Sequence, residues 1–468
     1  MSTRFTYVVQ TLVLYLFLMS FSLKTFAIEP VSFIDLTVRQ TNYGSAPQVT
    51  VQETNYSEVS PSFLIFKRMG SPENSHALVK ASGYLVLPMS DGVDFSAALP
   101  EAYLDLYYEP RKSLFSFGRK LHTWSELDSL WKLGLWQPLV RTDAANPVEQ
   151  GLIGAFYELK NKNFKAALMA SPLFLPDQQP DYDEESGQIV SANRWFRPPV
   201  SRLEIENNTS RVNYEVSEPD FSNIIDNTTV AGLLRIGQDA GGVFLLASAS
   251  DKPMNQFHLT IDPAKGLGIL DSTINVTIYP VVVRHQLYTF ETGYKWSDGQ
   301  VVLSTTTENI EDPRLPEEWE QTELIDSRYS GAIYSQDLSH WGLNRSSLGL
   351  SYVVREKRTE GDSSTAIEGD IDASTSRFNF EKLVGAQFKF NLIRKYKREL
   401  DTSFKYVYSI EDQGEWIQAG LQLREDRNWI WSLALDVFGV PENTPTKSSF
   451  ISMFRGNDRI SGSLTYVF

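Results

Sequence analysis

The last 90 residues alternate between apolar and small or polar side chains with a period of two, which is typical of β-strands. In 384–392 the even-numbered positions are apolar, and the odd-numbered positions are glycine, glutamine, lysine and asparagine. Three further segments, 403–410, 416–423 and 429–437, alternate in the same way. A short charged sequence at 394–399 lies between 384–392 and 403–410. The pattern therefore predicts four consecutive strands joined by short turns.

The same alternation recurs in 288–296 and 347–354. A soluble sandwich with one hydrated face also alternates. Strands of about 9–11 residues with aromatic ends, joined in turn by short and long polar connections, are instead typical of a transmembrane barrel. In such a barrel, Glu291, Lys389 and Lys405 are expected to point into a lumen where water can solvate them.

The N-terminal segment has the pattern of a signal peptide. Arg4 precedes an apolar stretch at 7–23, and small residues at Thr25 and Ala27 offer a cleavage site. The alternative, a single transmembrane anchor, is disfavoured because polar residues interrupt the apolar stretch. We therefore expect residues 1–27 to direct secretion and to be removed, and residues 28–468 to form the barrel.

The C-terminal segment 460–468 places apolar side chains on one face and ends in an aromatic residue. It resembles the C-terminal insertion signal of outer-membrane barrels, which the barrel-assembly machinery reads, and its key residues are Leu464, Tyr466 and Phe468. The alternative is an ordinary terminal strand. The combination with a signal peptide predicts an all-β, antiparallel transmembrane barrel in an outer membrane.

Alternation along the chain assigns each connection to one end of the barrel, starting from Phe468 as periplasmic. The long polar stretches 172–200, 308–327 and 356–380 then fall outside, and the short links 161–163, 297–299 and 425–427 fall inside. The count is about 18 strands, with 16–20 possible, and such a barrel is expected to enclose an aqueous lumen. This strand count assumes a weakly marked strand in 201–227, and it leaves open whether 31–56 forms one strand or two.

Composition excludes several kinds of function. The chain has no cysteine, and its formal net charge is −15. Segment 1–27 carries two basic and no acidic residues, so the mature chain has 41 basic against 58 acidic residues, or −17. The basic surface that nucleic-acid binding needs is missing. The five histidines are scattered and no nucleophile or metal motif is present, so we expect no enzyme activity, no cofactor and no metal site.

One hairpin carries a family resemblance. Residues 103–110 and 114–124 resemble a hairpin of alginate-export-type porins, in which a Gly-Arg pair closes a strand and a Trp follows. Here these residues are Gly118, Arg119 and Trp124, and the step Asn146-Pro147 and the ending 455–468 also look like that family. The resemblance implies a monomeric 18-stranded channel whose pore is constricted by a loop.

The segment 122–150, rich in tryptophan, is the candidate for that loop. It either folds into the lumen and sets the pore width or packs on the barrel rim, and the sequence favours neither. The candidate pore-lining or constriction residues are Arg119, Lys120, Trp124, Arg141, Glu291, Lys389 and Lys405. For Arg119, pairing with a carboxylate such as Asp105 is the alternative role.

The expected function is an outer-membrane channel for passive or facilitated diffusion of small hydrophilic solutes, anionic ones included. The alternative is a non-channel outer-membrane barrel with a surface-interaction, assembly or hydrolytic role. The expected partners are outer-membrane lipid and lipopolysaccharide, the barrel-assembly machinery and an unidentified small solute.

Overall fold

The computed structural model describes residues 31–468 except for 45–53, 71–74, 91–94, 109–111, 200, 206–207, 219–226, 239–240, 263–272, 312–319, 322–325, 344, 358–379, 396, 412, 427 and 442–449. The predicted signal peptide, residues 1–27, lies outside the described residues. So does most of the long stretch 356–380. Within the described part of the chain, no helix is long and apolar enough to cross a membrane.

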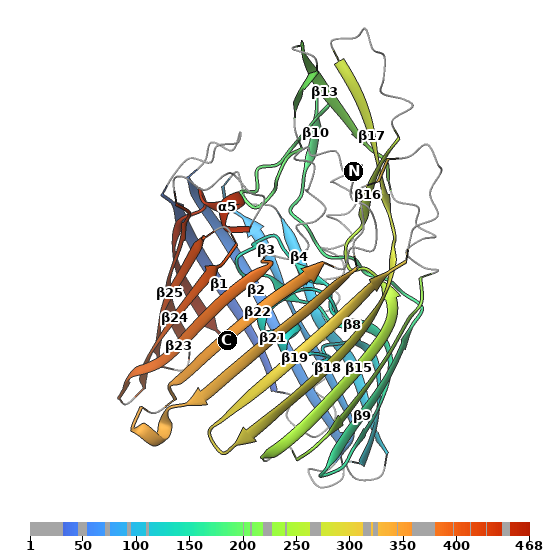
Figure 1. The fold of residues 1–468 in the computed structure, drawn as a ribbon. Coiled ribbons are helices and arrows are strands. Elements are labelled where there is room, and N and C mark those ends of the chain that lie inside the picture. The colour runs from blue at the N-terminus through green and yellow to red at the C-terminus, as the bar shows by residue number, and fades with distance from the viewer. Residues whose placement is uncertain are drawn as a thin grey trace.

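Eighteen strands form a single closed antiparallel sheet (Figure 1). Each strand pairs with the next one along the barrel, and β1 pairs with β27 to close it, with Asp35 opposite Val467 and Tyr43 opposite Arg459. The predicted 18-stranded barrel is confirmed. Its strands are β1 (Val31–Tyr43), β2 (Asn55–Gly70), β3 (Ser75–Pro88), β4 (Ser96–Tyr108), β5 (Ser113–Lys120), β8 (Leu152–Lys160), β9 (Phe164–Ser171), β14 (Thr229–Ile236), β15 (Gly242–Pro253), β18 (Arg284–Trp296), β19 (Gly299–Ile310), β21 (Ser327–Asp337), β22 (Ser347–Lys357), β23 (Lys382–Lys395), β24 (Arg398–Ser409), β25 (Glu415–Glu425), β26 (Trp429–Gly439) and β27 (Arg459–Val467).

The alternation in the sequence sorts side chains between the two faces of this sheet. On β26, Trp431, Leu433 and Leu435 are exposed on the outer surface, while Asp436 on the other face is buried. Exposed apolar side chains of the same register surround the barrel, and they include Leu36, Val38, Phe117, Tyr157, Leu168, Leu234, Val243, Tyr288, Phe290, Leu303, Leu350, Tyr352 and Leu421. A continuous apolar belt of this kind is the surface that a barrel presents to lipid.

The connections differ strongly between the two ends of the barrel, as Figure 1 shows. The strand ends that flank the long stretches 172–200, 308–327 and 356–380 all lie at one end of the barrel, here called the long-loop end. The links near residues 161–163, 297–299 and 425–427 belong to the other, the short-turn end. This assignment agrees with the alternation of connections predicted from the sequence.

Two uncertain regions of the sequence are resolved by the structure. Segment 31–56 contributes one complete strand, β1, and the start of β2. The expectation of a barrel strand in 201–227 is wrong, because β12 (Arg202–Ile205) and β13 (Asn208–Val216) belong to a separate five-stranded sheet. That sheet also contains β16 (His258–Asp262), β17 (Thr273–Val281) and β20 (Glu320–Gln321), and β13 pairs with β17 in parallel. It extends beyond the long-loop end of the barrel (Figure 1).

The remaining elements are short and lie in the connections. They are α3 (Glu126–Trp131), β6 (Leu139–Val140), β7 (Val148–Glu149), β10 (Asp183–Glu185), β11 (Gln188–Val190), the 3₁₀ turn η2 (Ser339–Trp341) and α5 (Phe450–Phe454).

The two faces of β26 give a test of the lipid-facing assignment. Leu433→Arg places a charge in the apolar belt and is expected to lower the free energy of unfolding in lipid vesicles by about 2–4 kcal/mol. Ser432→Arg, one residue away on the inner face, is the matched control and is expected to have a much smaller effect. Denaturant unfolding followed by tryptophan fluorescence measures both, and equal effects of the two variants would contradict the assignment.

Candidate functional site

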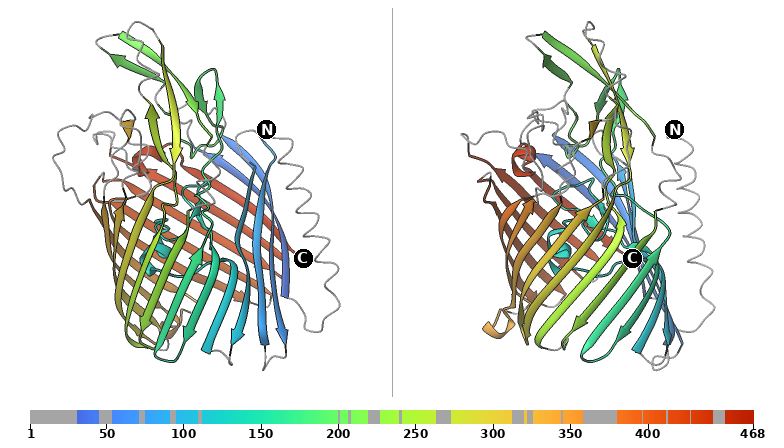
Figure 2. Two further views of the ribbon diagram at one scale, coloured as in Figure 1. Left: turned by 90° about the vertical axis from the view of Figure 1, so that its right-hand side faces the viewer. Right: turned by 45° about the vertical axis from the view of Figure 1, so that its right-hand side comes forward.

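The connection from β5 to β8, residues 121–151, folds into the barrel and does not pack on its rim (Figure 2). Its side chains and backbone contact inward-facing residues of several strands. The Trp136 indole donates to Thr289 Oγ1 at 3.1 Å, and Ser248 Oγ donates to the Trp124 carbonyl at 2.7 Å. Trp131 lies so close to Gly385 that a Cβ there would fall 2.5 Å from its ring. Of the two positions that the sequence leaves open for this loop, the structure has the one inside the lumen.

A carboxylate of the wall holds the start of α3. Ser125 caps the helix by accepting from the Asp128 backbone N–H at 3.2 Å. Glu291 Oε1 on β18 accepts from Ser125 Oγ at 2.8 Å and from the Glu126 backbone N–H at 2.9 Å, where the helix dipole favours negative charge. Ser304 on β19 donates to the same oxygen at 2.7 Å.

Glu291 is therefore a structural anchor for the loop. Its side chain is 0% exposed, so the expectation that water solvates it is wrong. The loop covers the wall at this point and donates hydrogen bonds to Oε1, whereas Oε2 is buried without a hydrogen-bonding partner.

Asp128 fixes the fold of the loop from within. Its carboxylate accepts from the backbone N–H groups of Leu135 at 3.0 Å and Trp136 at 3.3 Å. Burial raises the pKa of Asp128 to about 7, because desolvation outweighs these two hydrogen bonds. The protonation state of the loop interior therefore changes close to neutral pH.

The loop packs on an apolar inner wall, which the sequence analysis did not predict. The apolar side chains of the loop form one core with inward-facing residues of the strands from β8 to β19, namely Leu152, Phe156, Ala167, Met169, Ala231, Leu233, Phe244, Leu246, Leu287 and Val302. The expectation of an aqueous lumen without a packed core is thus wrong, and the same core extends to Tyr329, Val353, Leu383, Val407, Trp416 and Phe438 on the strands from β21 to β26. The loop supplies the second apolar surface that these residues need.

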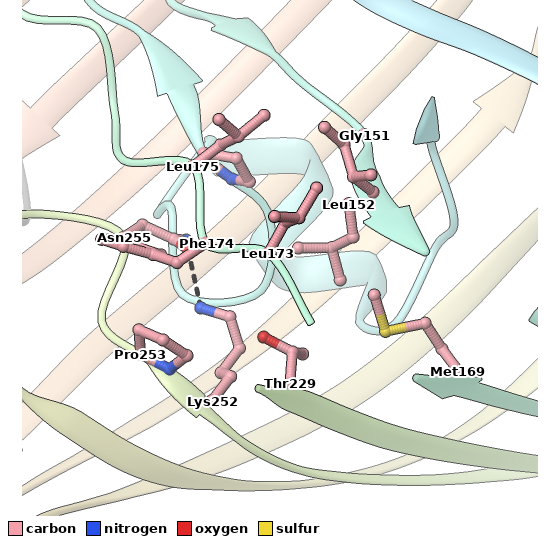
Figure 3. A pocket seen from close by; sticks show the side chains of 12 residues that line it. Gly151, Leu152, Met169, Leu173, Phe174, Leu175, Thr229, Lys252, Pro253 and Asn255 are labelled. Carbon is pink, nitrogen blue, oxygen red and sulfur yellow. Dashed lines mark hydrogen bonds between the residues drawn. The ribbon is translucent and has the colours of Figure 1, made fainter. Parts of the chain in front are cut away.

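A buried polar network anchors the loop near the long-loop end of β15, β18 and β19. Lys252 Nζ donates to the Leu135 carbonyl at 3.2 Å and to Asn255 Oδ1 at 2.7 Å, and Figure 3 shows this second contact. His285 lies 3.3 Å from Lys252 Nζ and 2.6 Å from Glu308 Oε1. The adjoining pocket has room for about one water molecule, so it is not a solute site.

The far part of the loop contacts strands on the other side of the lumen. Arg141 forms a buried ion pair with Asp177 at 2.9 Å. Asp143 lies 2.9 Å from the Arg459 guanidinium on β27, and Asn146 accepts from the Gln418 amide on β25 at 3.0 Å. The loop thus crosses the lumen from β5 to β25 and β27.

A second group of segments packs inside the barrel at its long-loop end. Trp195, from the connection between β9 and β14, packs 5.0 Å from the ring of Phe454 in α5 and 6.1 Å from that of Phe438 on β26. Arg194 donates to the Gly456 carbonyl at 2.6 Å. This aromatic cluster joins two connections that are distant in the sequence.

These insertions divide the lumen into two halves. In the half nearest the long loops, every strand except β3 carries a buried inward-facing residue. These residues are Thr41, Tyr56, Glu101, Lys120, Leu152, Met169, Ala231, Ser250, Leu287, Thr306, Tyr329, Val353, Leu383, Val407, Trp416, Phe438 and Arg459. Near the short turns, inward-facing Lys389, Ser403 and Gln422 on β23, β24 and β25 are exposed. On other strands, inward-facing Ser116, Glu158, Phe244 and Val302 are buried near the same end. The Arg39 side chain is 45% exposed beside Glu58.

The structure separates the two cationic candidates on β5. Lys120 faces inward, where its ammonium group lies 3.1 Å from Asp105 and 2.9 Å from Glu158. Arg119 shares the outward register of Phe115 and Phe117, and its guanidinium donates to the Gly151 carbonyl at 3.1 Å. Asp105, which the sequence analysis pairs with Arg119, contacts Lys120 instead, because Asp105 and Arg119 lie on opposite faces of the sheet.

The other candidates occupy different environments. Trp124 is buried and stacks on Trp136 with ring centroids 5.3 Å apart. Lys405 lies between two tryptophans, 5.0 Å from Trp131 and 4.4 Å from Trp416. Lys389 faces the exposed half of the lumen. A pore-lining role remains a proposal for each of them.

The C-terminal candidates lie on the last strand. Tyr466 packs on Trp429 with ring centroids 4.7 Å apart and on Phe468 at 4.8 Å. Phe468 is 69% exposed, and its backbone N–H donates to the Ile34 carbonyl.

Sequence reasoning missed Arg459 and Gln418 as contacts of the loop, and Asp436 as the carboxylate that binds both of them. Asp436 could have been flagged, because it is a carboxylate on the polar face of a strand in which Trp431, Leu433 and Leu435 occupy the other face. The partners of Arg459 and Gln418 lie about 300 residues away along the chain, so no local pattern indicates them.

Loss of the Glu291 anchor is expected to loosen the loop. Glu291→Ala leaves four donors, namely Ser125 Oγ, Ser304 Oγ and the backbone N–H groups of Glu126 and Leu127, without this acceptor. It should lower the free energy of unfolding by about 1–3 kcal/mol. It should also make residues 121–151 sensitive to protease, as limited proteolysis with mass spectrometry would detect. Glu291→Gln keeps an oxygen acceptor and serves as the milder control, and a protease-resistant loop in Glu291→Ala would contradict the anchoring role.

Asp128 is expected to make stability depend on pH. Since its pKa is higher in the folded than in the unfolded state, the folded state holds the extra proton between about pH 4 and 7. The free energy of unfolding should therefore fall as pH rises through this window and stay level above it. Urea unfolding of wild type and Asp128→Asn at pH 5 and pH 8 measures this effect, and an equal pH response in both proteins would refute it.

The chain was compared with known families, curated proteins and solved structures. No family model matches it, and neither does any curated protein. Among solved structures it is similar to OccAB4 of Acinetobacter baumannii, with 11% identity, coverage of 94% of this chain and 98% of that one, and a TM-score of 0.46. It is also similar to OpdQ of Pseudomonas aeruginosa, with 11% identity, coverage of 94% of this chain and 99% of that one, and a TM-score of 0.44.

A third similar structure is Wzi of Escherichia coli, described as an outer-membrane protein involved in group 1 capsule assembly and a carbohydrate-binding β-barrel. It gives 10% identity, coverage of 92% of this chain and 83% of that one, and a TM-score of 0.42. None of these three is described as an alginate exporter, so that resemblance stays a prediction. Because the TM-scores are below 0.5, the assignment of this chain as a barrel rests on its own strand pairing.

Proposed function

We propose that this chain is a porin-like outer-membrane channel for diffusion of small hydrophilic solutes, with its passage narrowed by residues 121–151. The observation that carries the proposal is the division of the barrel interior. The loop packs in an apolar core inside the barrel, whereas inward-facing polar side chains near the short turns of β23, β24 and β25 are exposed to solvent. Polar groups that line such a space select solutes by width, charge and hydrogen bonding.

The polar wall supports a location for the passage. On β1, β2, β26 and β27 the inward positions include the hydroxyl groups of Thr37, Ser60, Ser432, Ser463 and Thr465. Thr37 and Thr465 are hydrogen-bonded across the closing pair at 2.8 Å. Such side chains hydrate well and bind solutes weakly, as a diffusion channel requires.

A preference for anionic solutes is the finer part of the proposal. Lys389 and Arg424 both lie on inward register and are exposed to solvent. Cations with this exposure attract anions into the vestibule near the short turns. Lys389→Glu should therefore shift the ion preference of the channel towards cations.

The envelope partners are part of the same proposal. The apolar belt suits outer-membrane lipid, and the acidic composition suits lipopolysaccharide bridged by cations. Leu464, Tyr466 and Phe468 form the surface proposed to bind the barrel-assembly machinery, and residues 1–27 are proposed to direct secretion.

A non-channel barrel with a surface-interaction, assembly or hydrolytic role is the second candidate. One observation favours it, namely the buried residues that surround the lumen near the long loops. A barrel filled in this way would hold its long loops rigidly without passing solutes.

Electrical recording separates the two candidates. We expect the purified, folded protein to produce discrete current steps in a planar lipid bilayer, because the loop narrows the passage and leaves a hydrated wall. Under a salt gradient the reversal potential should indicate anion preference in wild type and a smaller preference in Lys389→Glu. A folded protein that stays silent at every voltage would overturn the channel proposal.

A further inference from the structure

A short turn in the loop contacts the barrel wall through two polar side chains, while Ala144 and Ala145 between them pack on the apolar core. In the latch turn, residues 143–146, the Asn146 backbone N–H donates to the Asp143 carbonyl at 3.1 Å. The Ala145 N–H donates to Asp143 Oδ1 at 3.1 Å. These bonds fix the turn so that the side chains of Asp143 and Asn146 both reach the wall. Elsewhere the loop is held largely by its apolar core and buried anchors.

The wall receives this turn with three residues on adjacent strands, here called the clasp: Gln418, Asp436 and Arg459. They are register neighbours, with Gln418 opposite Asp436 and Asp436 opposite Arg459. Asp436 is 2% exposed and accepts from Arg459 Nε at 2.8 Å and from Gln418 Nε2 at 3.0 Å. The wall carboxylate therefore orients both donors.

Each donor of the clasp also holds one end of the latch turn. The Arg459 guanidinium lies 2.9 Å from Asp143 Oδ2, and Gln418 Nε2 donates to Asn146 Oδ1 at 3.0 Å. The charged contact is the stronger of the two, because both of its partners are ionised. The Asp143 side chain retains 31% exposure, so water can compete for it.

Arg459 also connects the loop with the aromatic cluster. Its guanidinium lies 5.1 Å from the ring of Trp195, which packs against Phe438 and Phe454. A single cation thus touches the latch turn, the wall and the second connection at the long-loop end.

The clasp lies where exposure along the polar wall changes. On β1, Arg39 faces the lumen with 45% exposure, whereas Thr41, two residues nearer the long loops, is 9% exposed. Thr41 is bonded to Ser461 at 3.0 Å, and Ser461 follows Arg459 on the inward face of β27. The latch turn and its clasp therefore stand at the closed end of the hydrated wall.

From this geometry we propose that docking of residues 143–146 in the clasp closes the passage along β26, β27 and β1, and that release of Asp143 from Arg459 opens it. Arg459 is then the residue that positions the loop and sets the width of the passage. The proposal rests on the channel function proposed above.

The direct test is Asp143→Ala, which removes the ionised contact and leaves every barrel strand unchanged. Glu149→Ala is the matched control, because it removes another loop carboxylate that is paired with Lys132 and lies away from the clasp. We expect Asp143→Ala to raise the open probability in planar bilayers by on the order of tenfold, as loss of a charge-assisted hydrogen bond implies. Glu149→Ala should behave as wild type.

A chemical probe tests the latch without any current. The chain has no cysteine, so Thr41→Cys introduces a single thiol behind the clasp. In lipid vesicles, Asp143→Ala should increase the rate at which a small charged methanethiosulfonate modifies this thiol, again by on the order of tenfold, and Glu149→Ala should not.

The outcomes separate the two proposals. If the wild type conducts, and Asp143→Ala changes neither the open probability nor the labelling rate, the latch proposal is overturned and the channel proposal stands. If no protein conducts but the thiol is labelled faster in Asp143→Ala, the channel proposal is overturned. The latch then stands as a movable closure of the lumen. Silence together with unchanged labelling overturns both.

Discussion

The rest of the structure depends on the closing of the sheet between β1 and β27. Backbone groups in a membrane must find partners within the protein, and only a sheet without edges provides them all. Pairing from Asp35–Val467 to Tyr43–Arg459 completes this arrangement. Closure fixes which side of every strand faces outward, so the apolar belt and the interior follow from one register. It also creates an interior too wide for the strands' own side chains to fill.

The protein fills much of that interior with its connections, and it does so unevenly. From β8 to β19 the inner wall is apolar and packs on the loop, with Glu291 and Lys252 as buried polar anchors. From β24 to β2 the wall carries hydroxyl, amide and charged groups, together with buried Val407, Trp416 and Phe438 near the long loops. Apolar packing gives the loop a fixed position on one side, whereas on the other side polar contacts can exchange with water. The interior thus combines a rigid half with an adjustable one.

The fold was largely predictable because the membrane makes strand patterns regular. Alternation in 384–437 and around Glu291 gave the strands and the order of connections correctly. It failed in 201–227, where β13 pairs with the distant β17 outside the barrel. It also failed to show the packed half of the lumen, because Leu287 and Val302 face inward against a loop whose position depends on tertiary contacts. The partners of Arg459 are likewise set by the fold, although Asp436 stood out as a polar residue in an apolar strand.

The placement of residues 121–151 has a consequence for the order of folding. The loop leaves the wall after β5, yet its partners Glu291, Gln418 and Arg459 belong to strands formed from the second half of the chain. Contacts over such sequence separations form slowly. Once β1 and β27 are joined, the wall is continuous and the loop can enter only through the long-loop end. The loop reaches Arg459 only when β27 has taken its place in the wall, so closure of the sheet and completion of the interior are both late steps of assembly.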